Sequence, residues 1–340
     1  MSEGLEVRAL SVRYPVGGGV FAQRRDVAAV TDVSLQVVPG ETVGIVGESG
    51  CGKSSLARAL VRLAPVSAGR VCWDGQDLTD LDEDAFRKMR PDIQMVFQDP
   101  FASLNPRMRM ADLIAEPLKT HHPNMPGSER RKRIAQAVDQ VGLSMEMAGR
   151  FPHEFSGGQA QRIGIARAIV LRPKLLICDE AVSALDVSVQ ALILALLKRL
   201  QSELGLAILF ISHDLAVVRH MCDRVVVLYL GRVMEEGPAG ALLADPLHPY
   251  TRALRASVLS RDPGVSRGRR PPAIGDDLPS PLAPPPGCLF HTRCPHAAPL
   301  CATDVPVQRE IVPGRSVACH YAENIAADPG WRPGNQTEVA

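Results

Sequence analysis

Apolar and polar positions along the chain follow two spacings, one typical of strands and one of helices. Short apolar or alternating runs predict strands over residues 7–14, 29–38, 42–46, 93–97, 175–179 and 207–211. Apolar residues three or four apart predict helices over 55–61, 81–89, 110–118, 128–141, 162–169 and 188–204, with Ser128 capping the fourth. The Asp74-Gly75 pair predicts a hairpin turn. This succession of strands and helices indicates an α/β fold.

Composition narrows the class of partner. The 340 residues are 46% hydrophobic but only 4% aromatic, and 38 Lys and Arg balance 37 Asp and Glu. A balanced charge gives no general reason to expect nucleic acid as a partner. No apolar segment approaches the ~18 to 20 residues that span a bilayer, and residues 1–10 lack an apolar signal core. We therefore expect a cytoplasmic protein.

The stretch from Gly47 to Ser54 carries the strongest chemical signal. It matches the phosphate-loop pattern G-x-x-x-x-G-K-[ST] and lies between a predicted strand and a predicted helix, where Leu56, Leu60 and Leu63 keep helical spacing. Its glycines let backbone N–H groups turn toward a polyphosphate, while the lysine reaches the β- and γ-phosphates and the serine holds Mg²⁺. The nucleotide-binding residues expected from this stretch are Gly47, Ser49, Gly50, Cys51, Gly52, Lys53, Ser54 and Ser55.

Later segments place further polar groups at strand ends and at a helix start. Gln98 follows a strand, at the edge where ligands gather in an open α/β sheet. The segment Ser156–Gln159 contains two glycines at a helix start, which leaves N–H groups for an anion. Another strand ends in Asp179 and Glu180, which are placed to bind Mg²⁺ and to polarise a water against the γ-phosphate. His213 ends the last predicted strand, within reach of the same phosphate.

The order and spacing of these motifs resemble those of the ATP-binding cassette (ABC) ATPases. The segments from Phe97 to Arg107, from Asp179 to Ser188 and from His248 to Arg252 further resemble the ATPase subunits of oligopeptide and dipeptide importers. The resemblance covers residues 7–320. It implies an α/β fold, namely an ABC-type phosphate-loop ATPase core with an antiparallel β subdomain and a helical subdomain, plus a small C-terminal cysteine-rich module. It also implies ATP hydrolysis coupled to solute uptake, with ATP and Mg²⁺ as cofactors.

Family roles transfer to the matching positions of this sequence. By resemblance, Tyr14 would stack on adenine, Gln98 would contact Mg²⁺ and the attacking water, Glu180 would be the catalytic base, and His213 would hold the γ-phosphate. The Mg²⁺ ligands would be Ser54, Gln98 and Asp179. The other residues implied at the nucleotide, several of them reaching the site of the opposite subunit, are Ser156, Gly157, Gly158, Gln159 and Asp186.

The same resemblance implies a membrane-associated assembly. Two ATPase subunits would sandwich two ATP molecules head to tail, with a related second chain favoured over a second copy. Residues 99–107 would grip the cytoplasmic coupling helix of a permease. The assembly would contain two transmembrane permease subunits, with the ATPases at the cytoplasmic face of the inner membrane, and an extracytoplasmic solute-binding protein would take part indirectly. Peptides are the default solute, although related importers take up nickel, glutathione, haem or sugars. Two other readings remain open: a soluble ABC ATPase that acts on DNA or ribosomes, and a metal-sensing regulatory partner.

The end of the chain differs in composition from the rest. We expect an ABC domain over residues 5–260, with its helical subdomain over 99–170, followed by a proline-rich linker over 261–287, a cysteine module over 288–321 and a tail over 322–340. Four cysteines close together in a cytosolic chain indicate metal ligation more than disulfides. By resemblance they would hold a 4Fe–4S cluster, while zinc and free thiols remain alternatives. These cysteines are Cys288, Cys294, Cys301 and Cys319.

Overall fold

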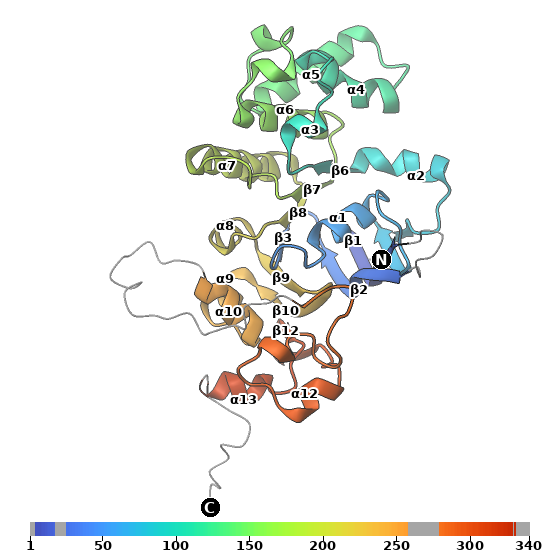
Figure 1. The fold of residues 1–340 in the computed structure, drawn as a ribbon. Helices are drawn as coiled ribbons and strands as arrows, with labels where there is room; N and C mark the ends of the chain where they lie inside the picture. The colour runs from blue at the N-terminus through green and yellow to red at the C-terminus, as the bar shows by residue number, and fades with distance from the viewer. Residues whose placement is uncertain (1–3, 18–24, 258–278, 329, 331–340) are drawn as a thin grey trace, which may run out of the picture.

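The computed structural model describes residues 4–17, 25–257, 279–328 and 330, which are arranged around a mixed sheet of eight strands (Figure 1). The strands from β9 to β6 are parallel, whereas β10, β12 and β11 extend the sheet in antiparallel fashion. In spatial order they are β11 (Arg309–Val312), β12 (Arg315–Val317), β10 (Arg232–Pro238), β9 (Arg224–Tyr229), β3 (Thr42–Val46), β8 (Ala207–Ile211), β7 (Leu175–Asp179) and β6 (Ile93–Val96).

The central strands of this sheet bring the predicted motifs to one edge. Strands β3, β7 and β8 are buried along their whole length, as expected for apolar runs covered on both faces. The residues that follow β3, β6, β7 and β8 are the phosphate loop, Gln98, Glu180 and His213. Because parallel strands end on the same side, four distant stretches of sequence meet there.

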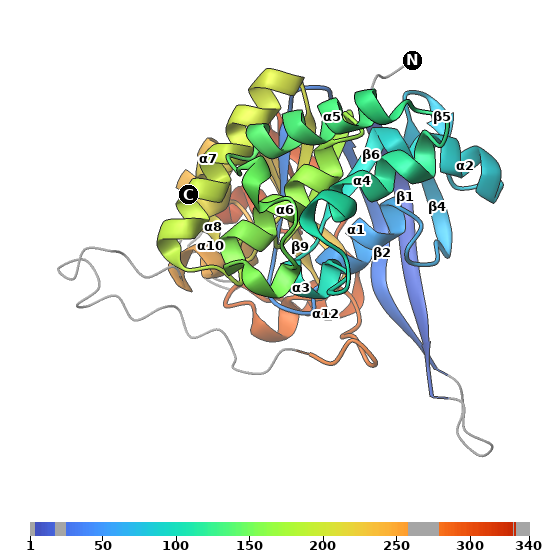
Figure 2. The same ribbon diagram turned by 90° about the horizontal axis from the view of Figure 1, so that it is seen from above.

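A second, antiparallel sheet packs beside the first. Its strand order is β2 (Arg25–Val37), β1 (Leu5–Val16), β4 (Ala68–Trp73) and β5 (Gln76–Asp77). Apolar residues of this sheet, such as Leu5 and Trp73, share a buried core with helix α1 (Lys53–Leu60) and with one face of the main sheet. Figure 2 shows β1 and β2 projecting together beyond the main sheet.

Helices cover the other face of the main sheet and form a separate group at one end of the molecule (Figure 1). That end group consists of α3 (Pro100–Ser103), α4 (Met110–His121), α5 (Gly127–Gln140) and α6 (Gly157–Ile169), with 3-10 turns at Met145–Met147 and Pro152–Glu154. The remaining helices and turns are α2 (Glu83–Met89), η1 (Arg90–Asp92), α7 (Val187–Leu204), α8 (Leu215–Met221), α9 (Ala239–Ala244), α10 (Pro249–Ser257), η4 (His291–Arg293), α12 (Pro299–Thr303) and α13 (Ala322–Ala327).

The C-terminal segment is built onto the main sheet. Strand β12 pairs with β10, with Val317 opposite Glu235. Cys288, Phe290 and Cys301 belong to the same apolar core as the residues of the main sheet. The described residues of this segment therefore pack onto the main sheet, and the separate cysteine-rich module that we expected at the C-terminus is not supported.

Three local expectations differ from the structure. Helix α1 ends at Leu60, because Arg62 takes a left-handed backbone conformation (φ 55°), and Leu63 is 60% exposed. Ser128 does not cap α5, which begins one residue earlier and receives no side-chain cap. Residues 322–327 form α13, with Ala322 and Ile325 fully buried, where we expected a tail. Of the predicted linker, residues 261–278 lie outside the described residues.

Candidate nucleotide-binding site

The phosphate loop joins β3 to α1 and is held by its own lysine. The side chain of Lys53 is 4% exposed, and its Nζ donates hydrogen bonds to the carbonyl oxygens of Gly47 at 2.8 Å and Glu48 at 2.9 Å. Gly52 has φ 102°, and a Cβ there would lie 2.1 Å from the carbonyl oxygen of Ala29. Only glycine fits this close approach, so the loop needs the residue that the motif specifies.

Ser54 and Asp179 meet at the start of α1. The Ser54 hydroxyl donates a hydrogen bond to Asp179 Oδ1 at 2.8 Å. Asp179 is 3% exposed, and its burial raises the pKa of its carboxyl group. A hydroxyl and a carboxylate in contact are two oxygen ligands of the kind that Mg²⁺ prefers.

Glu180 lies at the centre of the polar groups that follow the sheet. Gln98 Nε2 donates to Glu180 Oε2 at 3.0 Å, while His213 Nδ1 and Lys53 Nζ lie 3.5 Å and 4.0 Å from Glu180 Oε1. The backbone of Glu180 is left-handed, with φ 47°, and its N–H donates to the carbonyl oxygen of Ile211 at 3.1 Å. A non-glycine residue in this conformation stores strain, which is typical of functional positions.

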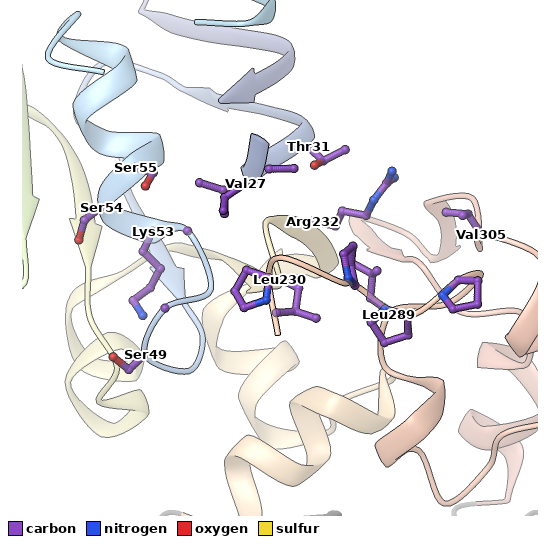
Figure 3. Close-up of a pocket in the computed structure, with 18 of the residues that line it drawn as sticks. Val27, Thr31, Ser49, Lys53, Ser54, Ser55, Leu230, Arg232, Leu289 and Val305 are labelled. Atoms are coloured by element: carbon purple, nitrogen blue, oxygen red, sulfur yellow. The ribbon is translucent and has the colours of Figure 1, made fainter. Parts of the chain in front are cut away.

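A pocket of about 510 Å³ opens beside these groups (Figure 3). On one side lie Ser49, Gly50, Gly52, Lys53, Ser54 and Ser55, and Gln98 and Glu180 also line the pocket. Of the other predicted residues, Gly47 and Cys51 belong to the loop without lining the pocket. Tyr14 is half-buried and does not line it either, but its cross-strand partner Val27 does.

The opposite side of the pocket comes from residues that the motifs did not identify. Leu230 follows β9 and Arg232 begins β10, while residues 284–287, Leu289 and Val305 come from the C-terminal segment. Figure 3 shows Leu230 and Leu289 on the other side of the pocket from Lys53 and Ser49. No local sequence pattern could have identified these lining residues. The proline-rich composition around residues 284–287 is typical of a linker, and the phosphate loop that they face lies far away in the sequence.

The Ser156–Gln159 segment lies at the start of α6 and does not line the pocket of its own chain. The Ser156 hydroxyl accepts a hydrogen bond from the Gln159 N–H at 3.3 Å, and the Gln159 side chain accepts one from the Ser156 N–H at 3.0 Å. This reciprocal cap fixes the start of the helix. Asp186 likewise caps the start of α7. The first turns of α6 and α7 are in contact, since a Cβ on Gly158 would lie 2.4 Å from Val189 Cγ1.

The four C-terminal cysteines border one small pocket and form no disulfide. Burial raises the pKa of the Cys294 and Cys319 thiols to about 12, and the neighbouring cysteines add to both shifts. The Cys294 sulfur accepts a hydrogen bond from the His296 N–H at 3.4 Å. Nevertheless, among the described residues no group of three or more His, Cys, Asp or Glu side chains is arranged to hold a metal ion. The predicted 4Fe–4S cluster is therefore not supported by the described structure.

Comparison with known proteins places the chain in a family. Residues 30–183 match the model of the ABC transporter family, and residues 234–301 match that of the oligopeptide/dipeptide transporter C-terminal region. The chain is 50% identical to the oligopeptide transport ATP-binding protein OppF of Salmonella typhimurium, over 89% of this chain and 92% of that protein. The chain belongs to the oligopeptide/dipeptide family of ABC transporter ATPases.

Other members of this ABC family show the same extent of similarity. The oligopeptide transport ATP-binding protein AppF of Bacillus subtilis is 51% identical over 93% of this chain and 96% of its own length. The di/tripeptide transport ATP-binding protein DppF of Pseudomonas aeruginosa is 48% identical over 96% and 99%. The match to relatives over nearly their whole length confirms the resemblance drawn from the motifs.

The fold agrees with that of ABC cassettes of known structure. A dimeric cassette, MJ0796, in a post-hydrolysis state bound to ADP and Pi is 32% identical, with a TM-score of 0.62, and the match covers 69% of this chain and 98% of that one. The ABC ATPase core expected from the sequence is therefore confirmed. In the part of the ABC chain that the structure describes, every helix is too short or too polar to cross a membrane.

Proposed function

We propose that this ABC ATPase powers the uptake of peptides through a membrane permease by hydrolysing ATP at the phosphate-loop pocket. The observation that carries the proposal is the position of Glu180, whose carboxylate lies between Gln98, His213 and Lys53 at the edge of that pocket. A carboxylate there can accept a proton from a water molecule that attacks the γ-phosphate.

The hydrolytic step uses few groups. Water forms a new bond to the γ-phosphorus, the bond to the β–γ bridging oxygen breaks, and the water proton passes to Glu180. Gln98 orients the water through its contact with Glu180, His213 holds a γ-phosphate oxygen, and Lys53 neutralises the phosphates once it leaves the carbonyl oxygens of its own loop. Ser54 and Asp179 would hold Mg²⁺, which neutralises charge on the β- and γ-phosphates when bound.

We further propose that two subunits share each nucleotide site. The Ser156–Gln159 helix start has N–H groups for a phosphate but does not line the pocket of its own chain. Next to it, Val187 and Leu192 on α7 are large apolar side chains that are 72% and 56% exposed. A second ATPase subunit, placed head to tail, would bury this surface and bring its own helix start to the pocket. A related chain and a second copy both fit this arrangement.

Transport requires a membrane partner, and the helical end of the molecule offers a contact. Phe101 on α3 is 44% exposed and follows Gln98 by three residues in the chain, so a permease that packs on it would sense the state of Gln98. Peptides are the proposed solute because the relatives at about 50% identity are named oligopeptide transport proteins. The subunit would sit on the cytoplasmic face of the inner membrane, with a solute-binding protein on the other side.

The substitution Glu180→Gln tests the ATPase assignment. It keeps the side-chain size but removes the proton acceptor, so phosphate release should fall at least about a hundredfold while a fluorescent ATP analogue still binds. Light scattering should show an ATP-dependent dimer that persists. The matched control is Glu203→Gln on α7, whose side chain is 46% exposed and pairs with Arg199. Normal turnover in Glu180→Gln would exclude this residue as the base.

The transport assignment needs the membrane partners. We would reconstitute the subunit with its permeases in vesicles and measure uptake of a labelled oligopeptide, with and without ATP. Uptake that depends on ATP and is lost in Glu180→Gln supports the proposal. If sugar or nickel is taken up and the peptide is not, the solute class is wrong; stimulation of the ATPase by DNA or ribosomes without permeases would favour the soluble alternative.

We also propose that Cys288, Cys294, Cys301 and Cys319 hold an iron–sulfur cluster in the native protein. The four thiols border one pocket, and a backbone N–H already donates to the Cys294 sulfur, as in cluster sites. A bound cluster would stabilise the thiolates of Cys294 and Cys319, the two thiols whose pKa burial raises to about 12. With no second redox motif in the sequence, its role would be structural or sensory.

Metal analysis and absorption spectra of protein purified without oxygen test this second proposal. Broad absorption near ~400 nm with about four irons per chain supports a 4Fe–4S cluster. One zinc and no colour would make the segment a zinc clip, and absence of both metals would withdraw the cofactor. The substitution Cys294→Ser should remove the iron and the absorption, whereas Cys72→Ser, outside the module, should leave both unchanged.

A further inference from the structure

Glu48, the second residue of the phosphate loop, is held by two groups from the last third of the chain. Its backbone N–H donates a hydrogen bond to the hydroxyl of Tyr250 at 2.9 Å. Its carboxylate accepts two hydrogen bonds from the guanidinium of Arg293, from Nη1 at 2.8 Å and from Nη2 at 3.0 Å. Such a forked pair fixes orientation as well as charge.

Arg293 itself is firmly placed. It belongs to the short turn η4 (His291–Arg293), and its side chain is only 10% exposed. Its guanidinium lies 5.7 Å from the ring centre of Tyr229 and donates to the hydroxyl of Tyr229 at 3.3 Å. The hydrogen bond to Glu48 raises the pKa of Arg293 further, so the cation persists at every physiological pH.

An aromatic cluster ties this turn to the rest of the protein. The rings of Tyr229 and Tyr250 lie 4.6 Å apart, and Phe290 lies 5.4 Å from both. All three side chains are fully buried. Because Phe290 precedes the turn directly, the cluster sets the position from which Arg293 reaches the loop.

The contact matters because of what surrounds Glu48. The carbonyl oxygen of Glu48 accepts a hydrogen bond from Lys53 Nζ, and the next two residues, Ser49 and Gly50, line the nucleotide pocket. An unpaired carboxylate at this position would place a negative charge beside a polyphosphate that carries several more. The paired guanidinium cancels that charge in a site only partly open to water.

We propose that Arg293 is a positioning residue for nucleotide binding: it acts through Glu48, neutralising that carboxylate and bracing the phosphate loop from the C-terminal segment. The inference rests on the proposed function, in which this loop binds ATP. The C-terminal segment would then contribute to ATP affinity through Arg293 and Glu48, whether or not its cysteines bind a metal. The role is in binding, since the hydrogen bonds from Arg293 to Glu48 act on the phosphate loop.

The test compares ATP affinity in Arg293→Gln, Glu48→Gln and the double variant, each as the full-length chain. Titration with a fluorescent ATP analogue gives Kd, and steady-state phosphate release gives KM and kcat. The matched control is Arg309→Gln, because Arg309 lies in the same segment and also makes a forked pair, with Glu323, but on the surface and away from the loop. Melting temperature reports the folding of each variant.

We expect Arg293→Gln to weaken ATP binding about tenfold, or about 1.4 kcal/mol, with KM raised and kcat within about twofold of the native value. The single variant Glu48→Gln should stay within about threefold of native affinity, because this substitution leaves no unpaired carboxylate beside the phosphates. The double variant should bind ATP more tightly than Arg293→Gln, because it lacks the Glu48 carboxylate that Arg293→Gln leaves unpaired. If Arg293→Gln fails to fold, Arg293→Lys keeps the charge without the fork and should show about a threefold loss.

Three results would overturn the inference. One is an affinity of Arg293→Gln within twofold of the control Arg309→Gln. Another is a double variant that binds no better than Arg293→Gln, which excludes the uncovered charge as the cause. The third is a failure of the underlying function: if native protein does not bind ATP, or if Lys53→Ala binds as well as native protein, both the phosphate-loop assignment and this inference fall. Native binding lost in Lys53→Ala but unchanged in Arg293→Gln refutes the inference alone.

Discussion

Replacing Arg315 with methionine measures how strongly the end of the chain is attached to the main sheet. Glu235 on β10 is fully buried, and its carboxylate accepts hydrogen bonds from the N–H groups of Leu247 at 2.9 Å and His248 at 3.0 Å and from Arg315 Nη2 at 2.9 Å. Arg315 lies on β12 and is 7% exposed. The two side chains thus form a buried ion pair between a strand of the cassette and a strand of the C-terminal segment.

Methionine preserves most of the apolar stem of arginine but removes its charge. Removing one partner of a buried ion pair costs about 3–5 kcal/mol, because it leaves an uncompensated buried charge. The two backbone N–H groups stay with Glu235, so we expect a value near about 3 kcal/mol. For a large domain this corresponds to a fall in melting temperature of about 6 °C.

Differential scanning calorimetry with urea unfolding would measure this change. The control is Arg309→Met in the same segment, whose partner Glu323 is 57% exposed, so that solvent screening should limit its effect to about 1 kcal/mol or less. The double variant Arg315→Met with Glu235→Gln should recover part of the loss. A melting temperature of Arg315→Met within about 1 °C of native protein, or equal to that of the control, would refute the reasoning.

Two further predictions concern binding and pH. Lys53→Ala removes the phosphate-facing cation and should raise Kd for ATP at least about tenfold by titration; unchanged affinity would contradict the loop assignment. Burial lowers the pKa of His248 from 6.5 to about 3, so the unfolded chain takes up a proton that the folded chain does not. Stability should therefore fall as the pH drops below 6.5, by about 1.4 kcal/mol at pH 5.5 in urea unfolding, and His248→Gln should lose that part of the pH dependence.

The sequence predicts which polar residues follow the central strands of the main sheet, because each of them belongs to a short local pattern. An apolar run specifies a buried strand, and the polar residue after the run then lies at the strand's carboxyl end. Gln98, Glu180 and His213 are predicted in this way, and the structure brings all three together around the Glu180 carboxylate. Ser54 and Asp179, which are 125 residues apart, meet for the same reason.

The sequence could not predict contacts that depend on tertiary packing. Residues 284–287 line the nucleotide pocket, although their composition is that of a linker. Helical spacing alone placed Leu63 on α1, but a left-handed Arg62 ends the helix before it. The pair of Glu48 and Arg293 joins residues 245 positions apart, and neither residue stands out in its own segment.

The separation of Glu48 and Arg293 by 245 positions affects the order in which the pocket forms during synthesis of the chain. A chain emerges from the ribosome N-terminus first, and its early segments begin to fold while later ones are still being made. The phosphate loop is then present for 245 residues of synthesis before Arg293 can reach Glu48, and the pocket wall from residues 284–287 and Leu289 is equally late. A growing chain, or one cut short before this segment, carries the full loop motif yet lacks the part of the opposite pocket wall that residues 284–287 and Leu289 supply. Under the proposed role of Arg293, tight ATP binding can begin only after this late segment has been made.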